Sequence, residues 1–210
     1  MFCCSDALKS YFENEWGETM RKADYNVLDL ILNRWSPRAM SGEDISHEEL
    51  MSLFEAARWA PSSYNNQPWR FVYALRNTAH WQMFFNLLVP ANQEWAKNAA
   101  ALILITSYRY FEYNGFTSRT HSFDTGSAVE NLSLQGYAMG LVIHGLEGFD
   151  YDRARVELGV PEGYDVEAMY VVGKRGPTSV LPDKLQEREV PSERKRVEEI
   201  AFEGKFGQRT

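Results

Sequence analysis

The stretch AAALILIT, residues 99–106, constrains the fold more than any other part of the chain. An amphipathic strand alternates apolar and polar residues, whereas this run is apolar without a break up to Thr106. Such a run is typical of a central strand that is covered on both faces. The chain is therefore expected to place other elements on both sides of one sheet.

Helix and strand patterns alternate through the rest of the chain. The stretch SHEELMSLFEAARWA predicts the clearest helix, because Ser46 and Glu49 have the spacing of a capping box and apolar residues follow at i, i+3, i+4 and i+7 from Leu50. Further helices are predicted at 27–32, 81–88, 124–139 and 152–158, and further strands at 71–75, 141–146 and 166–173. This order predicts one α+β or α/β domain.

Composition limits the class of protein. A chain of 210 residues with 44% hydrophobic residues suits one globular domain. The net charge of −7 argues against a nucleic-acid partner, and no stretch approaches the ~18 apolar residues of a membrane span. The two cysteines are adjacent, at Cys3 and Cys4, and the four histidines lack metal-like spacing, so we expect reduced thiols, no metal and a cytoplasmic location.

Two basic clusters are candidate anion sites. In RWSPR, Arg34 and Arg38 flank a serine just after a predicted helix, and guanidinium groups bind phosphate oxygens in pairs. RKR, residues 194–196, is the second cluster. Spacing alone favours a simpler interpretation for each, a basic loop at a helix C-terminus and a solvated charge run. Together the two clusters could hold one phosphate group.

The stretch PSSYNNQPWRF, residues 61–71, is more polar than a turn before a strand requires. The side chains of Asn65 and Gln67 each carry a donor and an acceptor, which suits the edge of a heterocycle. An ordinary Ser/Asn turn is the alternative. Farther along, in GLEGFD, Gly145 and Gly148 would permit close approach of the backbone or a positive φ. His144 is interpreted as a strand histidine, and no GxGxxG, Walker or GxSxG motif occurs.

Taken together, these motifs resemble the FMN-dependent nitroreductase family. The resemblance rests on RWSPRAM, APSSYNNQPWRF, DTGSAVENLSLQGYAMGL, GLEGFD, VPEGYDVEAMYVVGK and RKRVEEI, in this order between about residues 33 and 200. It implies an α+β fold with a mixed central sheet flanked by helices, in a domain-intertwined homodimer. It divides the chain into an N-terminal extension at 1–32, partly helical, an FMN-binding domain at 33–176 and a C-terminal arm at 177–210. The arm would wrap the partner subunit.

The resemblance also implies an FMN site at the dimer interface. The phosphate and nearby ribityl groups would be held by Arg34, Ser36, Arg194 and Arg196. Trp35 belongs to the same set, although family members often carry a second basic residue or histidine there. Arg38 would lie near the N1 and C2 carbonyl of the flavin, where a fixed cation stabilises the negatively charged reduced form.

The remaining implied contacts come from two other segments. The flavin would be reached from the other subunit by Pro61, Ser62, Ser63, Asn65 and Gln67. Its ring would be lined by Gly145, Glu147 and Gly148, with a main-chain donor near N5, and by Asn92.

The implied activity is an FMN oxidoreductase that passes a hydride from NADH or NADPH to a nitroaromatic, quinone or similar planar acceptor. Relatives with enone-reducing or dehalogenating reactions leave the acceptor open. A dimeric flavin-binding or sensor protein without turnover is the alternative class. The aromatic segment 108–116 is expected either to stack on a flat substrate or to pack at an interface.

Overall fold

The structure, a computed structural model, describes residues 21–208, so the N-terminal segment with Cys3 and Cys4 lies outside the described residues. The described chain divides into two compact units: residues 36–190, and residues 21–35 together with 191–208. The smaller unit contains α2 (Asp29–Asn33) and η3 (Val197–Glu199). Its two segments are joined by Arg21, which donates to the carbonyl oxygens of Leu32 and Ser192 at 3.0 and 3.1 Å.

The larger unit is built on a four-stranded sheet with the order β1-β2-β4-β3. The strands are β1 (Trp69–Leu75), β2 (Ala101–Tyr108), β3 (Leu141–Leu146) and β4 (Tyr164–Lys174). Each of the three neighbouring pairs among residues 36–190 is antiparallel. In the central pair Ala101 lies opposite Val172 and Tyr108 lies opposite Tyr164, with an irregularity between Ile105 and Thr106.

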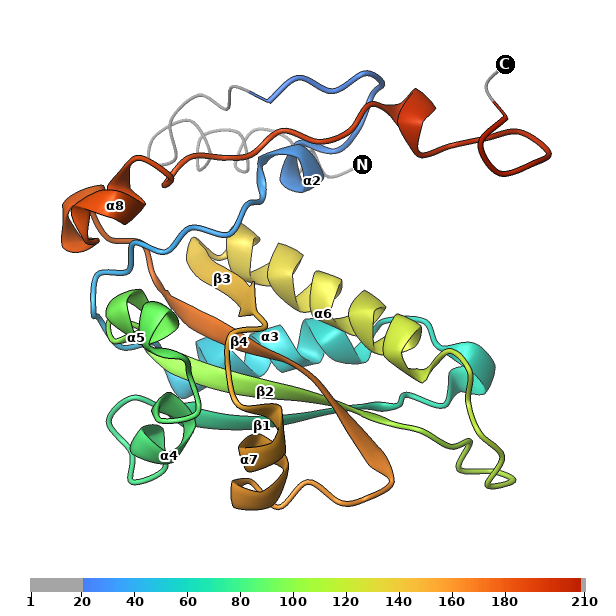
Figure 1. Cartoon of the computed structure of the whole chain (residues 1–210), viewed down its shortest axis with the longest axis horizontal. Coiled ribbons are helices and arrows are strands. Elements are labelled where there is room, and N and C mark those ends of the chain that lie inside the picture. The colour runs from blue at the N-terminus through green and yellow to red at the C-terminus, as the bar shows by residue number, and fades with distance from the viewer. Residues whose placement is uncertain (1–20, 209–210) are drawn as a thin grey trace, which may run out of the picture. The chain divides into compact units, whose positions relative to one another are not determined.

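Strand β2 is the doubly covered strand that the apolar run predicts. Leu102 and Leu104 belong to one buried cluster, whereas Ile103 and Ile105 belong to a second cluster on the other face. The second face is covered by α3 (His47–Arg58) and α6 (His121–Ala138) (Figure 1). The first face is covered by α4 (Trp81–Phe85), α5 (Pro90–Ala96) and α7 (Tyr151–Glu157). The expected α+β fold, with helices flanking a central sheet, is confirmed.

The capping box that the sequence predicts is formed at the start of α3. The Ser46 hydroxyl accepts from the Glu49 N–H at 3.0 Å, and the Glu49 carboxylate accepts from the Ser46 N–H at 2.6 Å. Helix α6 packs closely on β3, because a Cβ added at Gly136 would overlap the side chain of Ile143. Gly126, on the same helix, faces open space within the described chain.

Two short helical segments follow β4 in the larger unit. They are η2 (Thr178–Val180) and α8 (Asp183–Gln186), and the unit continues to residue 190. Leu181 and Glu189 are buried there, at 4% and 6% exposure. This part of the predicted C-terminal arm therefore packs with the sheet unit.

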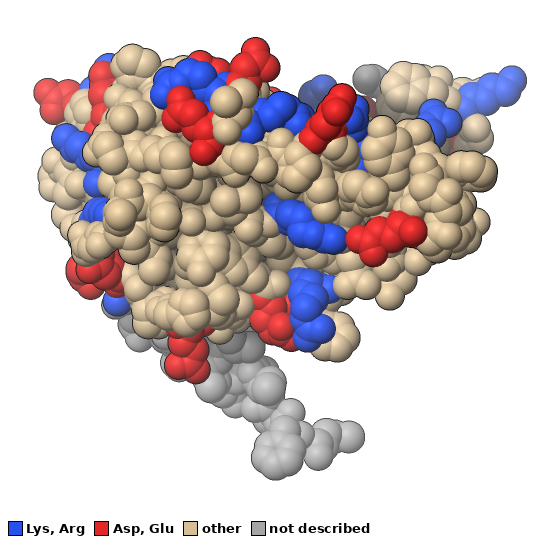
Figure 2. Space-filling model, turned by 90° about the horizontal axis from the view of Figure 1, so that it is seen from below, with Lys and Arg blue, Asp and Glu red and all other residues tan. Residues whose placement is uncertain are grey.

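No helix within residues 21–208 is long and apolar enough to cross a membrane, and these residues contain no His, Cys, Asp and Glu group able to hold a metal ion. On the face drawn in Figure 2, the coloured basic and acidic side chains are interspersed over a largely uncharged surface. That face carries no extended basic stripe among the described residues.

The contact between α6 and β3 can be tested with two glycine substitutions. Gly136→Ala should lower the free energy of unfolding by about 1–3 kcal/mol, because the added methyl group displaces Ile143. Gly126→Ala is the matched control on the same helix, and it should raise stability by about 0.5–1 kcal/mol through helix propensity. Urea unfolding followed by circular dichroism measures both. Equal effects of the two substitutions would contradict the close packing at Gly136.

Candidate functional site

The segment that carries Arg38 lies against the end of β4. The Ser41 N–H donates to the Lys174 carbonyl oxygen at 3.0 Å, and the Gly176 N–H donates to the Ala39 carbonyl oxygen at 3.0 Å. Ala39 and Met40 are fully buried in the cluster that contains α4, α5 and α7. The backbone on the C-terminal side of Arg38 is therefore fixed by the sheet.

The side chain of Arg38 is a half-buried cation. Its guanidinium carbon lies 6.0 Å from the centroid of the Trp95 ring, at the outer limit of a cation–π contact. The guanidinium forms no hydrogen bond or ion pair with any residue between 21 and 208. Because a partly desolvated cation without a counter-ion is costly, this position suits an anionic ligand.

His144 on β3 holds the same segment from another side. Its Nδ1 lies 2.9 Å from the Pro37 carbonyl oxygen, which can only accept, so Nδ1 carries the proton. Burial lowers the pKa of His144, and the positive charge of Arg38 adds to this effect against the raising effect of the hydrogen bond to Pro37. The imidazole is therefore neutral near pH 7, and its ring lies 4.6 Å from that of Trp95. His144 is a strand residue, as the sequence predicts.

Asn92 and Gly148 extend this group toward the turn after β3. The Asn92 amide donates to the Gly148 carbonyl oxygen at 3.0 Å, and its oxygen accepts from the Trp95 indole at 3.3 Å. Glu147 is exposed and lies in the chain between Gly145 and Gly148. Ser36 is half-buried at the start of the larger unit. Six predicted contacts, Ser36, Arg38, Asn92, Gly145, Glu147 and Gly148, therefore belong to two adjoining segments and α5.

The sequence predicts that Gly145 and Gly148 permit either close approach or a positive φ. Neither glycine has a positive φ, and both are closely approached by side chains. A Cβ at Gly145 would lie 2.6 Å from the Tyr170 ring, and one at Gly148 would overlap the Asn92 amide. Packing within the chain therefore accounts for both glycines.

The polar segment before β1 adopts a strained backbone. Tyr64, Asn65 and Gln67 have φ values of 53°, 53° and 48°, a region that non-glycine residues rarely occupy. The Ser62 carbonyl oxygen accepts from the Asn65 N–H, and the Ser62 hydroxyl accepts from the Gln67 N–H, both at 3.0 Å. The Ser63 N–H donates to the buried carboxylate of Asp124 at 3.0 Å. We call residues 61–67, with Pro61 at the start, the amide wall.

Aromatic side chains of the segment 108–116 pack against the amide wall. The rings of Phe111 and Tyr113 each lie 5.5 Å from that of Tyr64. Tyr64 and Phe116 remain exposed, at 78% and 72%. The segment therefore contacts the amide wall and still presents aromatic surface to solvent.

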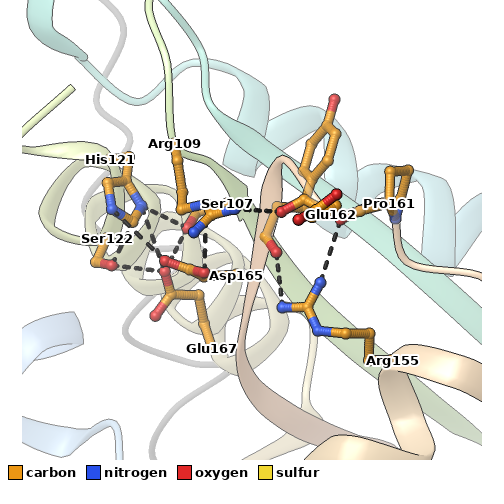
Figure 3. Close-up of polar contacts among 10 residues, drawn as sticks. Ser107, Arg109, His121, Ser122, Arg155, Pro161, Glu162, Asp165 and Glu167 are labelled. Carbon is orange, nitrogen blue, oxygen red and sulfur yellow. Dashed lines mark hydrogen bonds and ion pairs between the residues drawn. The ribbon is translucent and has the colours of Figure 1, made fainter. Parts of the chain in front are cut away.

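A polar cluster that sequence reasoning missed holds the start of α6 (Figure 3). The Ser107 hydroxyl lies 2.7 Å from His121 Nδ1 and donates to Glu167, which also accepts from Ser122 at 2.6 Å. Asp165 lies 3.8 Å from His121 Nε2. The residue types suggest a nucleophile with a base, but Ser107 is fully buried on β2 and cannot reach a substrate. The cluster therefore anchors α6, whose first turn carries Asp124.

The amide wall and the Arg38 segment lie at opposite ends of the sheet. The Tyr108 N–H donates to Pro68 O at 2.8 Å, and Tyr108 lies opposite Tyr164 at the start of β4, whereas the Arg38 segment contacts its other end. The eleven residues of β4 span about 35 Å. Figure 1 shows the same separation along β4. One copy of the larger unit therefore does not bring these two groups to a single pocket.

Four predicted contacts, Arg34, Trp35, Arg194 and Arg196, belong to the smaller unit. Arg194 donates to the Ser192 hydroxyl at 2.9 Å, and Arg196 forms an exposed ion pair with Glu198 at 3.4 Å. The Arg34 carbonyl oxygen accepts from Arg21 at 2.8 Å. That Arg34, Arg194 and Arg196 hold a phosphate group stays a prediction.

Comparison with known proteins assigns the class. The model of the nitroreductase family matches residues 31–174. A crystal structure described as an oxidoreductase containing FMN is 43% identical, with a TM-score of 0.86 over 90% of this chain and 97% of that chain. A nitroreductase family protein from Streptococcus pneumoniae shares the fold at 19% identity, with a TM-score of 0.65 over 84% of this chain and 99% of that one.

A shorter match is to a protein named for its activity. The oxygen-insensitive NADPH nitroreductase of Helicobacter pylori is 38% identical over 66 residues, which is 31% of this chain and 30% of that protein. The family match covers well over half of the sequence. The chain belongs to the nitroreductase family.

The neutral state of His144 predicts a pH dependence of stability. The folded state resists protonation of His144, whereas the unfolded chain binds the proton with an ordinary pKa near ~6.5. As pH falls through that value the unfolded state binds more protons, so the free energy of unfolding decreases. In His144→Gln the amide can still donate to Pro37, but this titration is lost.

Urea unfolding at pH 7.5 and 5.5 measures the effect, as each unit of lowered pKa contributes about 1.4 kcal/mol. The wild-type protein should lose more stability between the two values than His144→Gln does. Other titrating groups are common to both proteins and cancel in the difference. An identical loss in both proteins would show that His144 is not held neutral.

Proposed function

We propose that this chain forms a homodimer that binds FMN and works as an NAD(P)H-dependent oxidoreductase on planar acceptors such as nitroaromatics or quinones. Family membership supports the class of reaction. The 43% identical structure named for its FMN supports the cofactor, and the name of the Helicobacter pylori relative supports NADPH as one donor.

The observation that carries this proposal is the Arg38 cation. It is half-buried beside Trp95 on a backbone fixed by β3 and β4, and no described side chain neutralises it. A flavin with its phosphate supplies negative charge and a flat apolar ring, and the group formed by Arg38, Trp95 and Asn92 offers a cation, an aromatic face and an amide. The residues present therefore fit FMN.

The backbone strain of the amide wall gives a second, independent support. Three non-glycine residues with positive φ within four positions cost of order 1–3 kcal/mol each. Such strain persists where function requires it, and here it turns the exposed side chains of Asn65 and Gln67 outward. Side-chain amides recognise a ring edge that carries both carbonyl and N–H groups.

The separation of the two groups supports the proposed dimer. Because the Arg38 segment and the amide wall lie at opposite ends of β4, a pocket with both requires the amide wall of a second copy. Exposed aromatic side chains such as Phe123 on α6, at 78% exposure, and Tyr64 support a contact between copies.

Bound FMN would supply hydride transfer between the nicotinamide donor and the acceptor. The chain's own residues would bind, orient and tune it. Arg38 would favour whichever state of the ligand carries more negative charge. Asn65 and Gln67 would fix the ring edge, and the turn with Gly145 and Gly148 would bring main-chain groups to the ring. No buried nucleophile is needed, so the Ser107 cluster keeps its anchoring role.

Anaerobic titration of the FMN-loaded protein with NADPH or NADH tests the reaction. The yellow absorbance should bleach and return when a quinone or nitrofuran is added. Yellow protein that neither nucleotide bleaches would indicate the alternative, a flavin-binding protein without turnover. Colourless protein that does not take up added FMN would contradict both functions.

Arg38→Ala should lower the affinity for FMN by about tenfold or more, because a charge-assisted hydrogen bond contributes about 1.5–3 kcal/mol. It should also lower the reduction potential of the FMN that remains bound. Arg153→Ala, which removes an exposed cation paired with Glu157 in the same unit, is the matched control and should change neither quantity. Fluorescence quenching on FMN binding and dye-linked potentiometry measure them. Equal effects of both variants would remove the role of Arg38.

Two substitutions of Asn65 separate its amide from its backbone conformation. Asn65→Gly removes the amide and accepts the positive φ, whereas Asn65→Ala removes the amide and strains the backbone by about 1 kcal/mol. If the amide binds the cofactor, both should weaken FMN binding by a similar factor, while only Asn65→Ala lowers stability. Wild-type FMN affinity in Asn65→Gly would show that the amide makes no contact.

A further inference from the structure

Glu189 is a buried carboxylate that neither the sequence motifs nor the proposed FMN contacts use. It follows α8, near the end of the larger unit, and its side chain has 0% exposure. Buried ionised carboxylates are rare unless they are paired and accept hydrogen bonds, so this position needs a reason.

The hydrogen bonds of Glu189 identify what it holds. Its Oε1 accepts from the backbone N–H of Arg38 and from that of Ala39, each at 2.8 Å. The same oxygen accepts from Arg175 Nη1 at 2.8 Å, which supplies the opposite charge. Oε2 is buried and accepts no hydrogen bond from any residue between 21 and 208. One oxygen therefore accepts all three hydrogen bonds, two from the backbone at Arg38 and Ala39 and one from the side chain of Arg175.

The two backbone hydrogen bonds fix the peptide groups on both sides of the Arg38 Cα, and these set the direction of its side chain. The N–H groups on either side of the Arg38 Cα point to a single oxygen, and this restricts rotation of the backbone there. His144 holds the preceding carbonyl group, that of Pro37, at 2.9 Å. Bonds to an ionised acceptor are shorter and stronger than bonds to a neutral one, which suits an anchor.

We propose that Glu189 is a positioning residue for Arg38: through its Oε1 it holds the backbone that directs the guanidinium to where the N1 and C2 carbonyl of the flavin would lie. The proposal rests on the proposed FMN site, because its consequence is measured on bound FMN. Its structural part, the anchoring of the Arg38 backbone, can be measured without FMN.

Amide hydrogen exchange in the apoprotein tests the anchor directly. The N–H groups of Arg38 and Ala39 should be protected in the wild type and should lose protection in Glu189→Ala. Glu189→Gln keeps an oxygen acceptor at the Oε1 position and should retain protection. Leu53→Ala is the control for a general loss of stability, because Leu53 is fully buried in the other cluster. Leu53→Ala should not change how much more these two amides are protected from exchange than the amides next to them.

The effect on the site is tested by FMN affinity and reduction potential at saturating FMN. Glu189→Ala should weaken FMN binding by about tenfold and lower the potential in the same direction as Arg38→Ala. Glu189→Gln should stay within about threefold of the wild type. Adding Glu189→Ala to Arg38→Ala should produce little further change, because a residue that acts through another is not additive with it. Leu53→Ala should leave the potential unchanged.

Contrary results separate the proposal from the function on which it rests. If Arg38→Ala shifts affinity and potential while Glu189→Ala leaves both at wild-type values, the positioning role is overturned and the FMN site stands. If Glu189→Gln retains the protection of both amides but loses FMN affinity and potential as Glu189→Ala does, the anchoring of the backbone is not what positions Arg38, and the proposal is overturned. If the wild type binds no FMN, the proposed function falls, and the proposal falls with it.

Should Glu189→Ala not fold, Glu189→Asp replaces it. This variant keeps the charge beside Arg175 but withdraws the oxygen by one methylene. Smaller decreases of FMN affinity and reduction potential in Glu189→Asp would support the proposal. Wild-type values of both would overturn it.

Discussion

The pairing of β2 with β4 is the constraint on which the rest of the structure depends. β2 is buried on both faces, so its register with β4 cannot slip by one residue without exchanging the two clusters. That register places the amide wall beside the start of β4 and the Arg38 segment beside its end. The length of one strand therefore separates two halves of a site, and a second copy is needed to unite them.

Each half is held by a buried carboxylate that accepts from main-chain N–H groups. Glu189 holds Arg38 and Ala39 at one end of the sheet, and Asp124 holds Ser63 at the other. Charged acceptors make stronger hydrogen bonds than neutral ones, and a loop bound in this way can keep an unfavourable conformation. This explains how the amide wall retains positive φ values, and how an uncompensated arginine stays in place without a side-chain partner in the described chain.

The sequence predicts the elements that depend on local patterns. The capping box at Ser46, the apolar run of β2 and the bounds of β3 follow from spacing and hydrophobicity, and the structure confirms them. Helix α5 was missed because it has only seven residues and begins at Pro90, next to another short helix. The motif residues of the site could be recognised by resemblance. Glu189 could not, since it lies 151 residues from Arg38 and within a segment that looks like a charged arm. The φ values of Tyr64 and Gln67 were equally hidden, because neither residue type favours a positive φ.

A mixed dimer tests most directly whether the site is shared between two chains. Differently tagged Arg38→Ala and Asn65→Ala chains are refolded together, the heterodimer is isolated by both tags, and bound FMN is counted at limiting concentration. In a shared site one of the two pockets receives both mutations and the other receives none. The heterodimer should therefore bind one FMN with wild-type affinity, while each homodimeric variant binds weakly at both sites. A heterodimer without any wild-type site would show that Arg38 and Asn65 of the same chain form one pocket, or that they do not act on the same ligand.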